Sequence, residues 1–246
     1  MPDSVQATIR RMCNRYRPAS VVRVRDMFGF TYIESGPQVE HRYKTAGIGP
    51  WQQGPFVRAR ANDLDVGQWG LIPWFSEGRR PTGKAGRPIS TNNARIETIA
   101  TAPTFKGPWT QGQRCILPAE DFDEPYWGTG KNIWWRFARA DGQPWALAGL
   151  WSQWTDRSTG EIVLSYTMLT QNCDGHPILG LMHKPEPELP PDRQDKRTVV
   201  PLEPQDWDQW LHGSTDDALA LVKVPPCERI AHAAADPAQQ VPLPIA

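Results

Sequence analysis

Cys13 stands in the stretch Met-Cys-Asn-Arg-Tyr-Arg, which places a thiol close to two guanidinium groups. Positive charge from Arg15 and Arg17 would favour the thiolate, the form of cysteine that attacks electrophiles. The stretch is therefore typical of a nucleophile. A buried structural cysteine is the alternative interpretation, and the sequence around Cys13 leaves both open.

An amide, a guanidinium and a carboxylate alternate along residues 92–98, at Asn93, Arg95 and Glu97. If the segment is extended, alternate side chains point to the same face and form one polar site. The other interpretation is a junction between a strand and a helix, with Glu97 in the first helical turn.

Acidic residues gather where an apolar stretch at 114–117 ends. They are Glu120, Asp121, Asp123 and Glu124. A carboxyl group in a half-buried setting has a raised pKa and can act as a general acid or base. An acidic turn exposed to solvent is the competing interpretation.

Two histidines follow at His176 and His183, and the second opens a stretch at 183–198 that is rich in proline and charge. This composition predicts a long loop, and long loops in compact domains are often functional. Either histidine is a candidate for proton transfer or for a structural role.

The elements that must position these residues are mostly strands, because short apolar runs lie between glycine and proline. The expected strands are 20–24, 30–34, 56–60, 67–72, 114–117, 132–138, 145–150 and 162–169. We expect helices at 94–101, at 204–211, and after a capping box formed by Ser214 and Asp217. The 25 prolines argue against a helical bundle. The prediction is an α+β fold with mostly antiparallel strands.

The 27 Lys and Arg balance the 27 Asp and Glu, which argues against a cationic coat protein for nucleic acid. The balance is uneven along the chain, with a net +6 in residues 1–184 and −6 in 185–246. The first stretch also contains most of the 12 tryptophans, so a local basic groove with stacking platforms is compatible with the total.

Several classes are not expected from the sequence. There is no long apolar run for a membrane span and no secretory signal at the start, so we expect a cytoplasmic protein. The cysteines and histidines lack metal-ligand spacing, so we expect no metal. No cofactor is expected either.

Taken in order, a set of motifs resembles the SOS response-associated peptidase (SRAP) family, whose members crosslink to abasic sites in single-stranded DNA. The motifs are MCNRYR at 12–17, WGLIPW at 69–74, NARIET at 93–98, RCILPAEDFDE at 114–124, AGLW at 148–151, LTQN at 169–172, MHKP at 182–185 and DKRTVVPLEPQDWDQWL at 195–211. The resemblance covers residues 12–224. It implies a single domain at 13–224 with a curved or barrel-like sheet and a few peripheral helices. Residues 1–12 are then a leader or a misassigned start, and 225–246 an irregular tail.

The resemblance also implies residue roles. The nucleophile falls on Cys13, the site asparagine on Asn93, the catalytic glutamate on Glu124 and the catalytic histidine on His183. His176 competes for the last role, because the family usually has a compact His-x-Arg-Met-Pro where this chain inserts a loop after His183.

Residues that would bind DNA follow from the same resemblance and from residue type. The family arginine falls on Arg95, and the delayed arginine of the His-x-Arg pattern falls on Arg197, with Arg15 as a third cation. Trp69 and Trp74 are candidates for stacking on bases, with core packing as the alternative.

The family reaction joins the aldehyde of an abasic site to an N-terminal cysteine as a thiazolidine ring. Cys13 therefore needs a free α-amine, either because translation starts at Met12 and the methionine is removed, or because the chain cuts the bond between Met12 and Cys13 itself. The expected partner is single-stranded DNA with abasic sites, bound by a monomer away from membranes. A cysteine hydrolase that acts in trans and a non-catalytic, Trp-rich binder of single strands are the alternatives.

Overall fold

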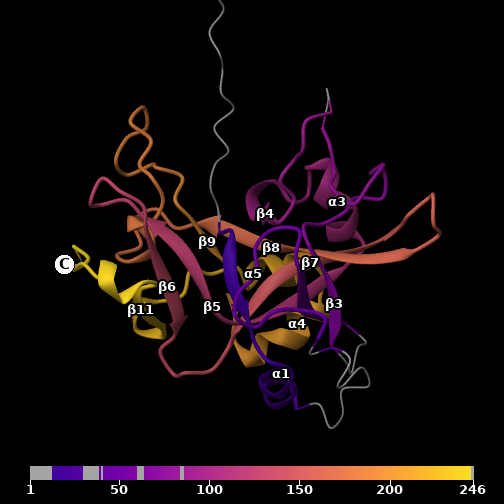
Figure 1. Ribbon diagram of the computed structural model, residues 1–246, viewed down its shortest axis with the longest axis horizontal. Coiled ribbons are helices and arrows are strands. Elements are labelled where there is room, and N and C mark those ends of the chain that lie inside the picture. The colour runs from indigo at the N-terminus through magenta and orange to yellow at the C-terminus, as the bar shows by residue number, and fades with distance from the viewer. Residues whose placement is uncertain (1–12, 30–38, 40, 60–63, 84–85, 245–246) are drawn as a thin grey trace, which may run out of the picture.

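The computed structural model describes residues 13–29, 39, 41–59, 64–83 and 86–244. In these residues eleven strands form one strongly curved sheet (Figure 1). They are β1 (Arg15–Pro18), β2 (Gln53–Arg58), β3 (Asp65–Trp69), β4 (Asn93–Arg95), β5 (Arg114–Tyr126), β6 (Ile133–Arg139), β7 (Trp145–Thr155), β8 (Ile162–Asn172), β9 (Arg197–Val199), β10 (Pro201–Leu202) and β11 (Ile230–Ala234).

Five of these strands close into a ring. β2 pairs with β3 and β5, β5 with β7, and β7 with β8, all antiparallel. A short parallel pairing of β3 with β8, through Gln68 opposite Ser165 and Trp69 opposite Tyr166, completes the barrel. The predicted α+β domain with a mostly antiparallel, barrel-like sheet is confirmed.

Helices are short and lie around this sheet (Figure 1). They are α1 (Val21–Phe28), α3 (Pro103–Thr110), α4 (Trp207–His212) and α5 (Thr215–Ala220), with 3-10 turns at Ile96–Thr98, Leu179–Leu181, Pro204–Asp206, Cys227–Arg229 and Pro237–Gln239. The expected capping box is present, because Ser214 accepts from the Asp217 amide while the Asp217 side chain accepts from the Ser214 amide. No helix among the described residues has the length and apolar character needed to cross a membrane.

Two expected elements have a different structure. The strand expected at 20–24 is helix α1, because Ser20 caps its first turn by accepting from the Arg23 amide. Gly29 ends the helix in the left-handed conformation that glycine tolerates, at φ 66°. The helix expected at 94–101 is instead β4 followed by a 3-10 turn, because β4 pairs with β8. The strand expected at 30–34 lies outside the described residues.

The expectation of an irregular tail at 225–246 is wrong for its middle part. β11 pairs antiparallel with β6, from Ile230 opposite Arg139 to Ala234 opposite Trp135. Ile230 and Ala234 are buried in the main core, and this burial is what recruits the segment to the sheet. The leader or start expected at 1–12 lies outside the described residues.

Aromatic side chains fill the core beneath the site. Trp69 and Tyr166 are fully buried, and the Tyr16 and Tyr166 hydroxyls lie 2.5 Å apart. The Trp69 ring packs edge-on against Tyr16, and its Nε1 donates to the Asn92 carbonyl at 2.8 Å. This cluster joins β1, β3 and β8 to the stretch before β4, so it sets the position of both Cys13 and Asn93.

Candidate functional site

Cys13 lies immediately before β1 and is buried, with 1% of its surface exposed. Its Sγ donates to the Arg15 carbonyl at 3.6 Å. Its own carbonyl accepts from Asn93 Nδ2 at 2.6 Å and, more distantly, from Asn92 Nδ2 at 3.5 Å. Two amides from the β4 segment therefore fix the backbone of Cys13.

Glu124 reaches the same place from β5. The antiparallel register sets Arg15 opposite Asp123, so Glu124 lies opposite the segment that carries Cys13. Its carboxyl group lies close enough to the Cys13 thiol for the two groups to shift each other's pKa. Burial raises the pKa of Glu124 well above its ordinary value, and the nearby charge of Asp123 adds to the rise. This rise in pKa favours the neutral carboxylic acid form of Glu124.

His183 completes the cluster from the loop that follows β8. Its Nε2 lies 3.4 Å from Glu124 Oε2 and 2.9 Å from the Arg197 carbonyl oxygen. Because a carbonyl oxygen only accepts hydrogen bonds, Nε2 carries the proton. Cys13, Glu124 and His183, which are far apart in the sequence, therefore meet at one point.

The backbone of His183 is held in an unusual conformation. Its φ is 62°, in the left-handed region that residues other than glycine rarely adopt. The His183 amide donates to the Pro125 carbonyl at 2.6 Å, and the His183 carbonyl accepts from Lys196 Nζ at 2.7 Å. Strain of this kind persists where surrounding contacts over-determine it, and it is concentrated at functional sites.

The thiol itself is not activated in the way that the sequence indicated. Burial, followed by the proximity of Glu124, raises the pKa of the Cys13 thiol well above its ordinary value. Arg15 lies 3.8 Å from Asp123, and Arg17 is hydrogen-bonded to Asp121, so both guanidinium groups are engaged with carboxylates. The expectation that they favour a thiolate is therefore wrong.

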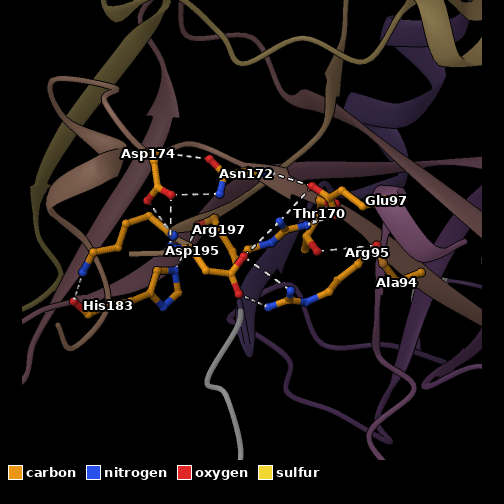
Figure 2. Close-up of polar contacts among 10 residues, drawn as sticks. Ala94, Arg95, Glu97, Thr170, Asn172, Asp174, His183, Asp195 and Arg197 are labelled. Carbon is orange, nitrogen blue, oxygen red and sulfur yellow. Dashed lines mark hydrogen bonds and ion pairs between the residues drawn. The ribbon is translucent and has the colours of Figure 1, made fainter. Parts of the chain in front are cut away.

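Two of the three arginines assigned to DNA, Arg95 and Arg197, lie together beside the histidine (Figure 2). Arg95 Nη2 lies 2.6 Å from Asp195 Oδ2, and its Nη1 lies 3.3 Å from Oδ1. Arg197 donates to both carboxylate oxygens of Glu97, from Nη1 to Oε1 at 2.9 Å and from Nη2 to Oε2 at 2.7 Å. Its Nη1 also lies 3.5 Å from Asp195 Oδ1. Asn93 contacts the Cys13 carbonyl, whereas Arg95 and Glu97 belong to this second cluster. The three alternating residues therefore do not form the single polar site that the sequence predicted.

Two candidates for stacking have opposite environments. Trp69 is 0% exposed, with its ring inside the barrel, so it cannot stack on a base and the DNA-binding prediction for it is wrong. Trp74 is 75% exposed and packs edge-on against Phe75. The two residues belong to one short motif, but Trp69 ends β3 inside the barrel and Trp74 lies on the loop that leaves it.

Arg15 lines a pocket beside β1. The guanidinium group is over the Trp134 ring, 5.5 Å from its centroid, and the side chain is more than half exposed. Arg17, Asp123 and Arg136 share the lining of this pocket of about 280 Å³. Arg15 is therefore accessible to a ligand, unlike Cys13.

His176 has a structural environment. Its Nδ1 accepts from the amides of Ile178 and Leu179 at 3.2 and 3.0 Å, and its Nε2 lies 3.0 Å from the Pro225 carbonyl. Cys227 Sγ is 3.8 Å from the same nitrogen. Since Nδ1 accepts, Nε2 carries the proton and cannot act as a base towards that thiol.

Sequence reasoning missed Asn92 and Lys196. Asn92 bonds Asn14 Oδ1 at 3.0 Å and reaches the Cys13 carbonyl, and its position just before the Asn93 motif was the available signal. Lys196 is buried beside His183, and only its position one residue before Arg197 pointed to it. Among the described residues, no group of three or more His, Cys, Asp or Glu side chains is arranged to hold a metal.

The barrel and its site define an α+β protein with a buried cysteine, acid and histidine next to paired arginines. The chain belongs to the SOS response associated peptidase (SRAP) family, whose sequence model matches residues 12–237. This confirms the resemblance drawn from the motifs.

Individual relatives agree with this assignment. The abasic site processing protein HMCES of Gallus gallus is 25% identical over 224 residues, 78% of this chain and 61% of the chicken protein. The abasic site processing protein YobE of Bacillus subtilis is 30% identical over 159 residues, 63% of this chain and 62% of its own. The matched regions thus cover less than two thirds of either relative.

Solved structures share the fold. A Bordetella bronchiseptica protein has a TM-score of 0.74 and 30% identity, and the match covers 91% of this chain and 100% of that one. A Bacteroides thetaiotaomicron protein has the same TM-score at 18% identity, with 91% and 92% covered, which shows the fold alone.

Proposed function

We propose that this protein captures abasic sites in single-stranded DNA by forming a thiazolidine between the ring-opened sugar and Cys13. The observation that carries the proposal is the meeting of Cys13, Glu124 and His183. Membership of the SRAP family and relatives named abasic site processing proteins support it. Reducing conditions in a cytoplasm would keep Cys13 as a thiol. The reaction needs no metal or cofactor, and a monomer is sufficient.

The chemistry requires the α-amine of Cys13 as well as its thiol. In a peptide bond the Cys13 nitrogen is an amide and cannot form an imine, so residues 1–12 must be absent from the reacting form. Removal of Met12 after translation from that residue is the simpler route. Self-cleavage of the bond between Met12 and Cys13, by thiol attack assisted by Glu124 and Asn93, is the other.

Glu124 transfers protons in both halves of the reaction. The Cys13 amine adds to the aldehyde carbon, and the neutral Glu124 carboxyl donates a proton as the carbinolamine hydroxyl leaves as water. The thiol then adds to the iminium carbon, forming the C–S bond, and its proton passes to the Glu124 carboxylate. The net reaction releases one water and returns Glu124 to its acid form. The raised pKa of Glu124 suits this alternation, and ring closure gains from proximity.

The neighbouring residues hold the reactants. His183 would donate to the sugar ring oxygen as the ring opens, and Asn93 holds the Cys13 backbone. Arg95 would bind a phosphate flanking the lesion, whereas Arg197 is nearly buried and holds Glu97 instead. Arg15 and Trp74 are exposed enough to contact the strand, with Trp74 stacking on a base.

The test is a denaturing gel. The form that starts at Met12 is incubated with a single strand that carries one abasic site, alongside the Cys13→Ala variant and a Cys227→Ala control. We expect an adduct that survives boiling in wild type and the control and is lost in Cys13→Ala. No adduct from wild type would refute the proposal. Salt-sensitive binding without an adduct would favour a simple strand binder, and peptide hydrolysis without an adduct a hydrolase.

The exposure of Cys13 has its own test. Intact mass of the native protein is expected to begin at Cys13, because only that form carries amine and thiol on one residue. Protein that retains residues 1–12 and still crosslinks would contradict this part of the proposal.

A further inference from the structure

The carboxylate of Asp195 lies between Arg95 and Arg197 (Figure 2). It makes a two-point contact with Arg95, at 2.6 and 3.3 Å, and lies 3.5 Å from Arg197. Paired N–H groups of a guanidinium are the groups that recognise a phosphate. Asp195 therefore occupies the face of Arg95 that a phosphate would need.

Asp195 is held there by its own backbone. Its φ is 55°, in the left-handed region. Asp174 accepts from the Asp195 amide at 3.0 Å and from the Lys196 amide at 2.9 Å, while Asn172 accepts from the Asp174 amide at 2.8 Å. Asn172 and Asp174 thus fix the backbone at Asp195, and this backbone directs the Asp195 carboxylate to Arg95.

The charges of the cluster cancel. Arg95 and Arg197 contribute two positive charges, and Asp195 and Glu97 two negative ones. Arg197 is nearly buried and is also bonded to the Thr170 carbonyl at 3.0 Å, so its partners leave little room for a ligand. A phosphate that approaches this cluster meets no net positive charge until Asp195 leaves Arg95.

We propose that Asp195 is a specificity-determining residue that competes with a DNA phosphate for Arg95. It lowers reversible affinity for undamaged single strands, so the protein is retained mainly where the bond to Cys13 forms. The inference rests on the proposed function, since it assumes that Arg95 binds the strand.

The test compares Asp195→Asn with Asp192→Asn. Asparagine tolerates the left-handed conformation of residue 195, so the substitution removes the charge and keeps the backbone. Asp192 lies on the same loop, is 78% exposed and forms an ion pair with the adjacent Arg193, at 3.9 Å. Both variants change the net charge by the same amount. We measure affinity for an undamaged single strand by fluorescence anisotropy at several salt concentrations.

We expect Asp195→Asn to bind the undamaged strand roughly fivefold to tenfold more tightly than wild type, with a salt dependence steeper by about 0.7 in the logarithmic slope for each additional phosphate that is bound. Asp192→Asn should stay within about twofold of wild type. Adding Arg95→Gln to Asp195→Asn should abolish the increase in affinity. Equal effects of the two single variants, or weaker binding by Asp195→Asn, would overturn the inference.

The gel test keeps the two proposals separable. If wild type forms no adduct, the proposed function fails whatever the binding data show. If wild type forms the adduct but Asp195→Asn binds undamaged DNA like Asp192→Asn, the proposed function stands and the role of Asp195 is rejected.

Discussion

Two neighbouring clusters, one around Cys13 and one around Arg95, hold their ionisable groups in different charge states. Around Cys13, burial raises the pKa of both the thiol and the Glu124 carboxyl, which favours their neutral forms. Around Arg95, the groups are charged and paired at 2.6 to 2.9 Å. Arg197 belongs to both, because its carbonyl accepts from His183 while its side chain binds Glu97.

Two glutamates make the contrast specific. Glu124 is 1% exposed and faces a thiol and an imidazole, so burial raises its pKa. The Glu97 side chain is 46% exposed, and although its partial burial acts to raise the pKa, hydrogen bonds from Arg197 and from backbone amides lower it overall. A neutral acid can donate a proton, whereas a paired carboxylate can only hold a cation. The first cluster is therefore suited to proton transfer and the second to reversible binding.

The largest effect expected from this contrast is the loss of adduct formation caused by the Glu124→Gln substitution. The substitution keeps the shape of the side chain but removes the acid, so the rate of adduct formation at saturating DNA should fall about 100-fold to 10,000-fold. Affinity for undamaged DNA should not change, because the arginine cluster is untouched. Single-turnover gels and anisotropy measure the two quantities.

Glu120→Gln is the matched control on the same strand. Glu120 pairs with Arg23 at 3.2 Å, away from Cys13. An equal rate loss in both variants would mean that the effect comes from β5 as a whole and not from the acid at position 124.

The second prediction concerns pH. Because the folded-state pKa of Glu124 is raised, the stability it contributes is complete below its ordinary value of 4.5 and is lost as pH rises towards the raised value. Relative to Glu124→Gln, the unfolding free energy of wild type should fall by about 1.4 kcal/mol per pH unit in that range. Urea titrations of both proteins between pH 5 and 8 measure the difference. A difference that does not vary with pH would show that Glu124 is not held neutral.

The third prediction tests the link between the clusters. Lys196→Met keeps the length of the side chain but leaves the His183 carbonyl without its donor, which should cost about 1 to 3 kcal/mol of stability. If Lys196 positions His183, the adduct rate should also fall while affinity for undamaged DNA stays the same, measured where both proteins are fully folded. Lys223→Met, at an exposed position, is the control and should change stability by less than about 0.5 kcal/mol.

The sequence was informative where a local pattern determines structure. Short apolar runs between glycine and proline located the six strands β2, β3, β5, β6, β7 and β8, and the Ser214 capping box located α5. The sequence was misleading where tertiary contacts determine the environment of a side chain. At Cys13, the neighbouring arginines pair with Asp121 and Asp123 across the β1–β5 pairing and do not activate the thiol. The opposite environments of Trp69 and Trp74 depend on where a strand leaves the barrel, and the pairing of Arg95 with Asp195 joins residues that are 100 positions apart. Neither follows from spacing.

The smallest effect expected is that of Arg95→Gln in the wild-type background. Asp195 already neutralises Arg95, so loss of the arginine should weaken binding of an undamaged strand only about twofold to fivefold and reduce the logarithmic salt slope by no more than about 0.7. The adduct rate at saturating DNA should equal that of wild type, since the groups around Cys13 are unchanged. Arg25→Gln, on α1 and paired with the adjacent Asp26 at 3.4 Å, is the control for net charge. A rate loss as large as that of Glu124→Gln would show that the two clusters act as one unit, because the paired charges would then be needed for chemistry as well as for binding.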